Sequence, residues 1–276
     1  MTGGPIDPRG PGSRPDPVET ARAVVETHHP DARQAWLSGS VVLGGAGPTS
    51  DLDVTVLLDA ADSGGAGDAV VHRRSLTHDG WPVELFVHTE ASVRHFVELD
   101  RRRRRPTMAR LVATGVPLLG GDAGAALQAE CADLVVAGPG PLSDEARDRA
   151  RYALTDLLDD LVDVAVSGGD RDRRGGAAGH AVAVEVWHQA AELLLAAAGR
   201  WSGTGKWLVR ELEEYDAEYD TAYAERLDAG LQAALSGDPN PLATVAEAVL
   251  DGVGGRLWAG YSAVATVEEP PPDATG

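Results

Sequence analysis

The chain has 276 residues, 43% of them hydrophobic, and carries a formal net charge of -19. A chain of this length can bury a sizeable core, in one large or two ordinary domains. Such an acidic surface repels nucleic acid in general and suits a cationic small molecule or a cationic protein partner, unless the charge serves solubility alone. The single cysteine, Cys131, excludes a disulfide framework and a cysteine zinc cluster.

Both ends of the chain are expected to be disordered tails. Residues 1–16 are rich in glycine and proline, and residues 263–276 form the second tail. The N-terminal segment lacks the apolar core of a signal peptide, and no apolar run approaches the length of a membrane span. We therefore expect a cytoplasmic protein without membrane contact.

A mixed pattern of helices and strands fills the first half of the chain. A helix is predicted from Pro17, and a short buried strand ends at Gly39 and Ser40. The clearest strand follows a glycine-rich segment. In DLDVTVLL, apolar residues on one face alternate with Asp51 and Asp53 on the other.

A hairpin is predicted next, because the turn THDG separates GDAVVHRRSL from WPVELFVH. On the second of these strands Glu84, Phe86 and His88 share one face. The elements that follow are predicted as a helix over 89–105 with Thr89 as its cap, a helix over 106–115, a strand over 116–121 and a helix over 122–136.

A cluster of glycine and proline, Ala137 to Asp144, predicts a domain boundary. Before it we expect an α+β domain over residues 17–137, with a small mixed β-sheet flanked by helices. After it we expect an all-helical, bundle-like domain over residues 143–262. The helices of this second domain are predicted at 144–166, 177–198, 207–214, 217–235 and 242–261.

Three acids form the candidate metal site. Asp51 and Asp53 lie two residues apart on one strand, so both carboxylates project from the same face, about 7 Å apart along the chain. Glu84 is an acid among apolar residues of a later strand, where an unpaired carboxylate is costly. A solvated strand face is the alternative explanation. The apolar setting favours Mg²⁺, because a cation relieves the repulsion between carboxylates and prefers hard oxygen ligands.

Gly39-Ser40, separated by ten residues from Asp51-Leu52-Asp53, resembles the signature of the polymerase β-like nucleotidyltransferase superfamily. The sequence is most similar to its small stand-alone members, the aminoglycoside nucleotidyltransferases and the minimal nucleotidyltransferases. The resemblance is close over residues 36–88. In the second half it extends only to a helical substrate domain.

The resemblance implies an adenylyltransferase that uses Mg²⁺ to transfer AMP from ATP to a hydroxyl group of a small molecule. An aminoglycoside-like antibiotic is the acceptor that suits the acidic charge. Gly39 and Ser40 would contact the phosphates, helped by backbone N–H groups of a following helix. Asp51 and Asp53 would hold Mg²⁺, and Glu84 would be a further metal ligand or the general base.

The sequence departs from the family after Gly39-Ser40, because the segment VVLGGAG carries no charged or polar side chain. A cation for the triphosphate must then come from elsewhere. Similar enzymes use a lysine of the C-terminal domain, which implies this role for Lys206, the one lysine of the chain; a solvated helix start is the alternative. Arg210 could share the role or pair with Glu214. Glu185 could be another general base or pair with a neighbour.

Two other functions are compatible with the same signature. Minimal nucleotidyltransferases also act as antitoxins, which bind or adenylylate a protein partner. Addition of nucleotides to the end of a tRNA is a third possibility, but the negative net charge and the lack of a broad basic surface count against it.

Overall fold

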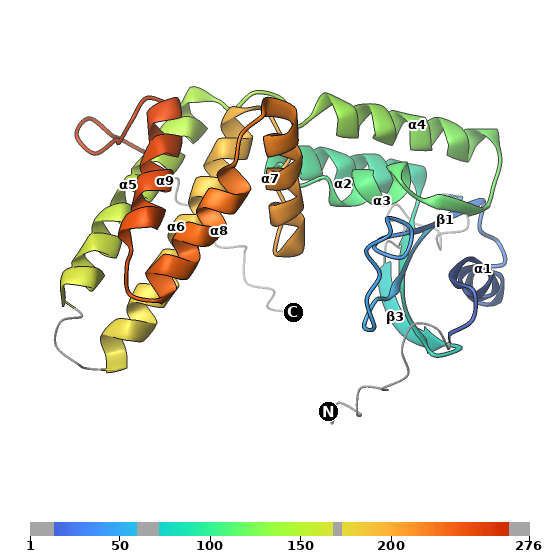
Figure 1. The fold of residues 1–276 in the computed structure, drawn as a ribbon. Coiled ribbons are helices and arrows are strands. Elements are labelled where there is room, and N and C mark those ends of the chain that lie inside the picture. Colours follow the sequence, from blue (N-terminus) through green and yellow to red (C-terminus); the bar gives the residue numbers. More distant parts are fainter. Residues whose placement is uncertain (1–13, 60–71, 168–172, 265–276) are drawn as a thin grey trace, which may run out of the picture. The chain divides into compact units, whose positions relative to one another are not determined.

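The computed structural model describes residues 14–59, 72–167 and 173–264. The chain forms two compact units that divide between Gly140 and Pro141. The first unit contains a five-stranded mixed sheet with helices on its faces, and the described part of the second unit is helical (Figure 1). This is the α+β fold class that the sequence predicts.

The sheet has the strand order β3-β4-β2-β1-β5. Its neighbours β2 and β4 are parallel, and the other neighbouring pairs are antiparallel. The strands are β1 (Gln34–Ser38), β2 (Leu52–Leu57), β3 (His72–His78), β4 (Trp81–His88) and β5 (Val116–Leu119).

The hairpin between β3 and β4 is tighter than the sequence suggests. Its turn consists of Asp79 and Gly80, both with positive φ, as a two-residue hairpin turn requires. Thr77 and His78 therefore belong to β3 and not to the turn. The expected beginning of this strand, residues 67–71, lies outside the described residues.

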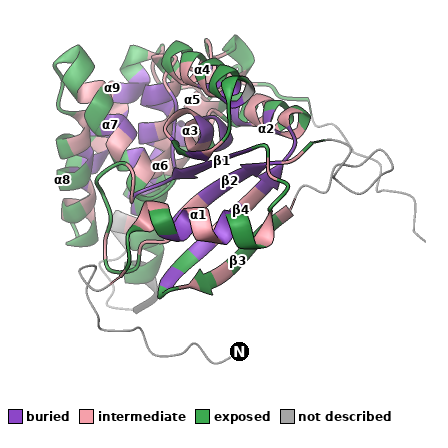
Figure 2. Cartoon of the chain, turned by 90° about the vertical axis from the view of Figure 1, so that its right-hand side faces the viewer, coloured by how far each residue is buried: buried purple, intermediate pink, exposed green. Residues whose placement is uncertain are grey.

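Helices cover both faces of the sheet. Helix α1 (Pro17–His28) lies across one face, where Val24 and Val25 join a buried cluster with Leu52 and Val54 of β2 (Figure 2). Leu57 of β2 belongs instead to the cluster on the opposite face. That face is covered by α2 (Glu90–Arg103), α3 (Thr107–Ala113) and α4 (Asp122–Ala137).

Successive side chains of β2 therefore point into the two cores in turn. The side of the strand that carries Asp53 is covered by helices along most of its length. Thr55 and Leu57 are buried under the helices, whereas Asp51 and Asp53, at the beginning of the strand, are half-buried. The carboxylates lie where this covered face opens to solvent.

The helix starts follow local chemistry that is visible in the sequence. Asp16 caps α1 by accepting hydrogen bonds from the amides of Val18 and Glu19, at 2.9 and 3.0 Å. Thr89 caps α2 in a reciprocal arrangement with Ser92, as its place in the sequence predicts. Of the expected N-terminal tail, residues 1–13 lie outside the described residues, while Asp16 and its neighbours belong to the first unit.

His88, the last residue of β4, is expected to contribute less to stability in acid than at neutral pH. Burial, followed by repulsion from His72, lowers the pKa of His88 from 6.5 to about 4. The unfolded chain then binds a proton that the folded chain resists, so stability is lost as the pH falls from 6.5 toward 4, by up to about 3 kcal/mol. Buried Asp100 acts in the opposite sense, since burial raises its pKa to about 6.

Urea unfolding of the wild type and of His88→Asn, at pH 7 and pH 4, separates the effect of His88 from that of Asp100. Asp100 is common to both proteins, so its effect cancels in the difference between them. The advantage of the wild type should shrink by up to about 3 kcal/mol on acidification. An advantage that stays constant between the two pH values would contradict the assignment to His88.

The helices of the second unit surround a core of leucines such as Leu154, Leu195 and Leu208. They are α5 (Asp144–Ser167), α6 (Arg173–Ala197), α7 (Lys206–Tyr219), α8 (Tyr223–Leu235) and α9 (Asn240–Gly252). Among the residues that the structure describes, no helix combines the length and the apolar character that a membrane span requires.

Several helix ends of this unit differ from the prediction, most of all at the break between α7 and α8 and at the end of α9. Helix α7 continues to Tyr219, and Asp220 then takes a left-handed conformation, whereas the sequence pattern placed the break at residues 214–217. The carboxylate of Asp216 accepts hydrogen bonds from the first amides of α8, at 2.8 and 2.7 Å. Helix α9 ends at Gly252 and not at residue 261, because Gly254 and Gly255 follow, both with positive φ.

Candidate metal centre

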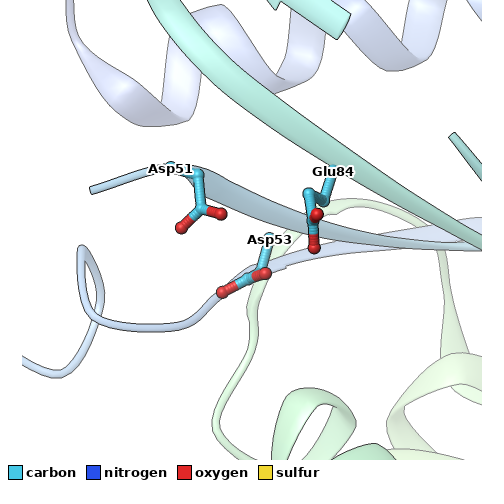
Figure 3. A group of neighbouring side chains, drawn as sticks. All are labelled: Asp51, Asp53 and Glu84. Atoms are coloured by element: carbon cyan, nitrogen blue, oxygen red, sulfur yellow. The ribbon is translucent and has the colours of Figure 1, made fainter. Parts of the chain in front are cut away.

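The three predicted acids come together at one point of the sheet. Asp51 directly precedes β2, Asp53 lies within β2, and Glu84 lies on β4. Because β2 and β4 are parallel and Asp53 is in register with Glu84, both side chains project from the same face. One ligand oxygen of each of the three carboxylates lies within 4.8 Å of the others, and Figure 3 shows the side chains converging.

This arrangement fits a small divalent cation. Mg²⁺ holds oxygen ligands at about 2.1 Å in an octahedron, so neighbouring ligand oxygens lie roughly 3 Å apart and opposite ones roughly 4 Å apart. The three carboxylate oxygens lie no more than 4.8 Å apart, which is close to that range. The donors are hard oxygens from half-buried side chains, the type that Mg²⁺ prefers. Within the described ranges, this is the one such cluster of three potential ligands.

The Gly39-Ser40 turn lies directly against this cluster. Ser38, the last residue of β1, is in register with Asp53, so the chain leaves β1 beside that carboxylate. Gly39 has φ +80°, and a Cβ atom at this position would collide with the carboxylate of Asp53. Only glycine allows the backbone to pass this close.

Ser40 is buried and closes the loop between the two parts of the motif. Its Oγ lies 3.1 Å from the Oγ of Ser50, which also accepts a hydrogen bond from the amide of Gly47 at 2.8 Å. The helix expected after Ser40 is absent. The described residues 40–44 form hydrogen-bonded turns, in which the amides of Val42 and Leu43 bond to the carbonyl of Gly39. The glycine-rich sequence favours turns over a helix.

Arg14 is a positioning residue that sequence reasoning missed. Its guanidinium donates hydrogen bonds to the carbonyls of Ser50 and Pro48, at 3.1 and 2.9 Å, and lies over the ring of Trp81. It holds the loop just before Asp51. No signal in the glycine- and proline-rich N-terminal sequence points to this role.

Arg73 is the other residue that sequence reasoning missed. It lies on β3, and its Nη2 contacts both carboxylate oxygens of Glu84, at 2.5 Å from Oε1. This hydrogen bond is the main reason why the pKa of Arg73 is raised, with further contributions from the charges of Asp53 and Asp51. The acidic cluster therefore has a cationic side chain at its edge.

The remaining predicted residues lie in the second unit. Lys206 is the first residue of α7 and is exposed. Arg210 lies over the ring of Trp207 at 4.7 Å, and Glu214 lies 3.6 Å from Arg200, so these contacts differ from the expected Arg210–Glu214 pair. Glu185, the other candidate base, is exposed and accepts a hydrogen bond from its neighbour Gln189 at 2.9 Å.

Comparisons with known proteins add little to this geometry. No protein-family model and no curated protein matches the sequence. Among solved structures, the chain is similar to a nucleotidyltransferase-like protein from Exiguobacterium sibiricum 255-15, with 12% identity, coverage of 86% of this chain and 79% of that chain, and a TM-score of 0.38. A likeness this distant carries no argument, so the chemistry of the site follows from its own residues.

Proposed function

We propose that the protein is a Mg²⁺-dependent nucleotidyltransferase that transfers AMP from ATP to a hydroxyl group of a small cationic acceptor. The observation that carries this proposal is the convergence of Asp51, Asp53 and Glu84, with the Gly39-Ser40 turn directly against Asp53. Such a site offers metal ligands and phosphate contacts side by side. Activation of a nucleoside triphosphate requires both.

The reaction is an in-line displacement at the α-phosphorus. Asp51 and Asp53 would hold Mg²⁺, which would supply neutralisation of the charge on the triphosphate. The turn at Gly39 and Ser40 would face the terminal phosphates with its amides and the Ser40 hydroxyl. The acceptor oxygen forms a bond to the α-phosphorus, and pyrophosphate leaves with the electron pair of the broken bond. Glu84 either takes the proton of the acceptor hydroxyl or would complete the metal site, in which case that proton passes to water.

The net charge of -19 supports a cationic acceptor, and an aminoglycoside is the best single candidate. The triphosphate role of Lys206 stays a prediction, which nucleotide binding by Lys206→Ala tests. Glu185 stays the second candidate for the general base.

Transfer can be measured with Mg²⁺ and ATP labelled at the α-phosphate. Separate reactions contain aminoglycosides, a protein fraction or an RNA fraction as the acceptor. We expect label on an aminoglycoside, in a reaction that Asp53→Asn loses. Asp59→Asn is the matched control, because Asp59 follows the other end of β2 and pairs with Arg33 at 2.8 Å. Label on protein would support the antitoxin-like function instead. Equal labelling by wild type and Asp53→Asn with every acceptor would refute catalysis.

A further inference from the structure

We infer that Arg73 is the cation that pairs with Glu84 in the metal-free protein. When a metal binds, it displaces Arg73 from Glu84, and Arg73 then binds the phosphates of the nucleotide. The metal step depends only on the acidic cluster. The phosphate step rests on the function proposed above.

The first step follows from the contacts of Glu84. Arg73 contacts both of its carboxylate oxygens, and the hydroxyl of Ser75 lies 3.5 Å from one of them. The side chain of Glu84 is only 19% exposed, so its charge needs a partner. In the metal-free protein Arg73 supplies that partner and relieves the repulsion among the three carboxylates.

The second step follows from competition for the same oxygens. A divalent cation bound to Glu84 repels the guanidinium of Arg73, which contacts both oxygens of the same carboxylate. The Arg73 side chain is 63% exposed and lies on the edge strand β3, so it can move into solvent without disturbing the core. Because the Arg73 side of the ion pair is exposed, water can replace its contacts, and a well-coordinated metal can displace it from Glu84. Arg73 therefore lowers the affinity of the site for metal.

The third step concerns the displaced guanidinium. It stays attached to β3 beside Glu84, where the phosphates of a nucleotide held through the metal would lie. The loop from Val41 to Ser50 has no basic side chain of its own. Arg73 thus provides, within the first unit, the cation that the motif lacks, and a guanidinium can bind phosphate through two hydrogen bonds.

Arg74 is a matched control, since it is the next residue on the same edge strand and carries the same charge. Arg73 is paired with Phe86 and Arg74 with Leu85, so their side chains project from opposite faces of the sheet. Arg73→Gln and Arg74→Gln change the net charge equally. Only Arg73→Gln removes the guanidinium that contacts Glu84.

Mn²⁺ binding without nucleotide is measured by calorimetry for the wild type, Arg73→Gln, Arg74→Gln and Arg73→Lys. We expect Arg73→Gln to bind Mn²⁺ about tenfold more tightly than the wild type, because a competing like charge is gone. Arg74→Gln should stay within about twofold, since screening weakens distant surface charges. The Mn²⁺ affinity of Arg73→Lys, which keeps the charge without the paired contact, should lie between those of the wild type and Arg73→Gln. Arg73→Lys also takes the place of Arg73→Gln in the test if Arg73→Gln does not fold.

Binding of ATP in saturating Mn²⁺ tests the phosphate step. Arg73→Gln should bind ATP about tenfold more weakly, the reverse of its effect on the metal alone. If Arg73 had a purely structural role, Arg73→Gln would weaken the binding of both Mn²⁺ and ATP. Unchanged or weaker Mn²⁺ binding by Arg73→Gln overturns the inference while the metal centre stands, and unchanged ATP binding overturns the phosphate step. Absence of Mn²⁺ binding in all four proteins overturns the metal centre itself, and the proposed function with it.

Discussion

Asp53→Asn is expected to abolish metal binding and nucleotidyl transfer while the protein stays folded. Asparagine has the shape of aspartate, but it removes one of three charges that share the site and offers a weaker ligand to Mg²⁺. We expect Mn²⁺ affinity and transfer each to fall by more than about 100-fold. Calorimetry and the labelled-ATP assay measure the two effects.

Thermal unfolding shows whether this loss is local. Metal at 100 times its dissociation constant stabilises a protein that binds it only when folded by about 2.7 kcal/mol. The wild type and Asp59→Asn should both gain this stability on adding metal, and Asp53→Asn should not. Without metal, Asp53→Asn should melt no earlier than the wild type, because the substitution relieves repulsion between carboxylates. Metal binding that survives the substitution would show that Asp53 is not a ligand.

Gly39→Ala is expected to disable the site by steric means, without changing any charge. The backbone at Gly39 has φ +80°, and the new Cβ would overlap the carboxylate of Asp53. Either the turn moves away from the acids or Asp53 rotates out of the cluster. We expect a loss of stability of about 1 to 3 kcal/mol and a fall in Mn²⁺ affinity of more than about tenfold.

Gly44→Ala separates backbone strain from the collision. Gly44 also has a positive φ, +76°, but a Cβ there would meet no atom within 4 Å. This variant should lose about 1 kcal/mol of stability and keep its affinity for metal. If both variants bind Mn²⁺ as the wild type does, the close approach of Gly39 to Asp53 has no functional importance. Urea unfolding and calorimetry on the same samples give both quantities.

The acidic cluster was predictable because its position depends on regular geometry. Alternation along a strand places Asp51 and Asp53 on one side, and an acid among the apolar residues of β4 is conspicuous. The α+β class follows from the same periodicities. The prediction of a helix after Ser40 was wrong. It came from the family resemblance, whereas the local glycines favour turns.

Arg73 and Arg14 were missed for different reasons, because Arg73 contacts a residue of the same hairpin whereas Arg14 contacts a distant loop. Arg73 reaches Glu84 diagonally across the hairpin, in the register that the two-residue turn at Asp79 and Gly80 sets. The four-residue turn that the sequence suggests would pair Arg73 directly with Glu84, so the predicted hairpin already carried this signal. Arg14 acts on backbone carbonyls, and these leave no trace in the side-chain sequence.

The register across β1, β2 and β4 also determines when the site comes into existence during folding. Ser38, Asp53 and Glu84 occupy one row of three neighbouring strands, so no local stretch of the chain contains the site. Contacts between such distant segments form late, and a slip of one residue would turn an acid to the other face. A luminescent lanthanide bound there would therefore report the completion of strand pairing and distinguish the native register from collapsed, misaligned forms.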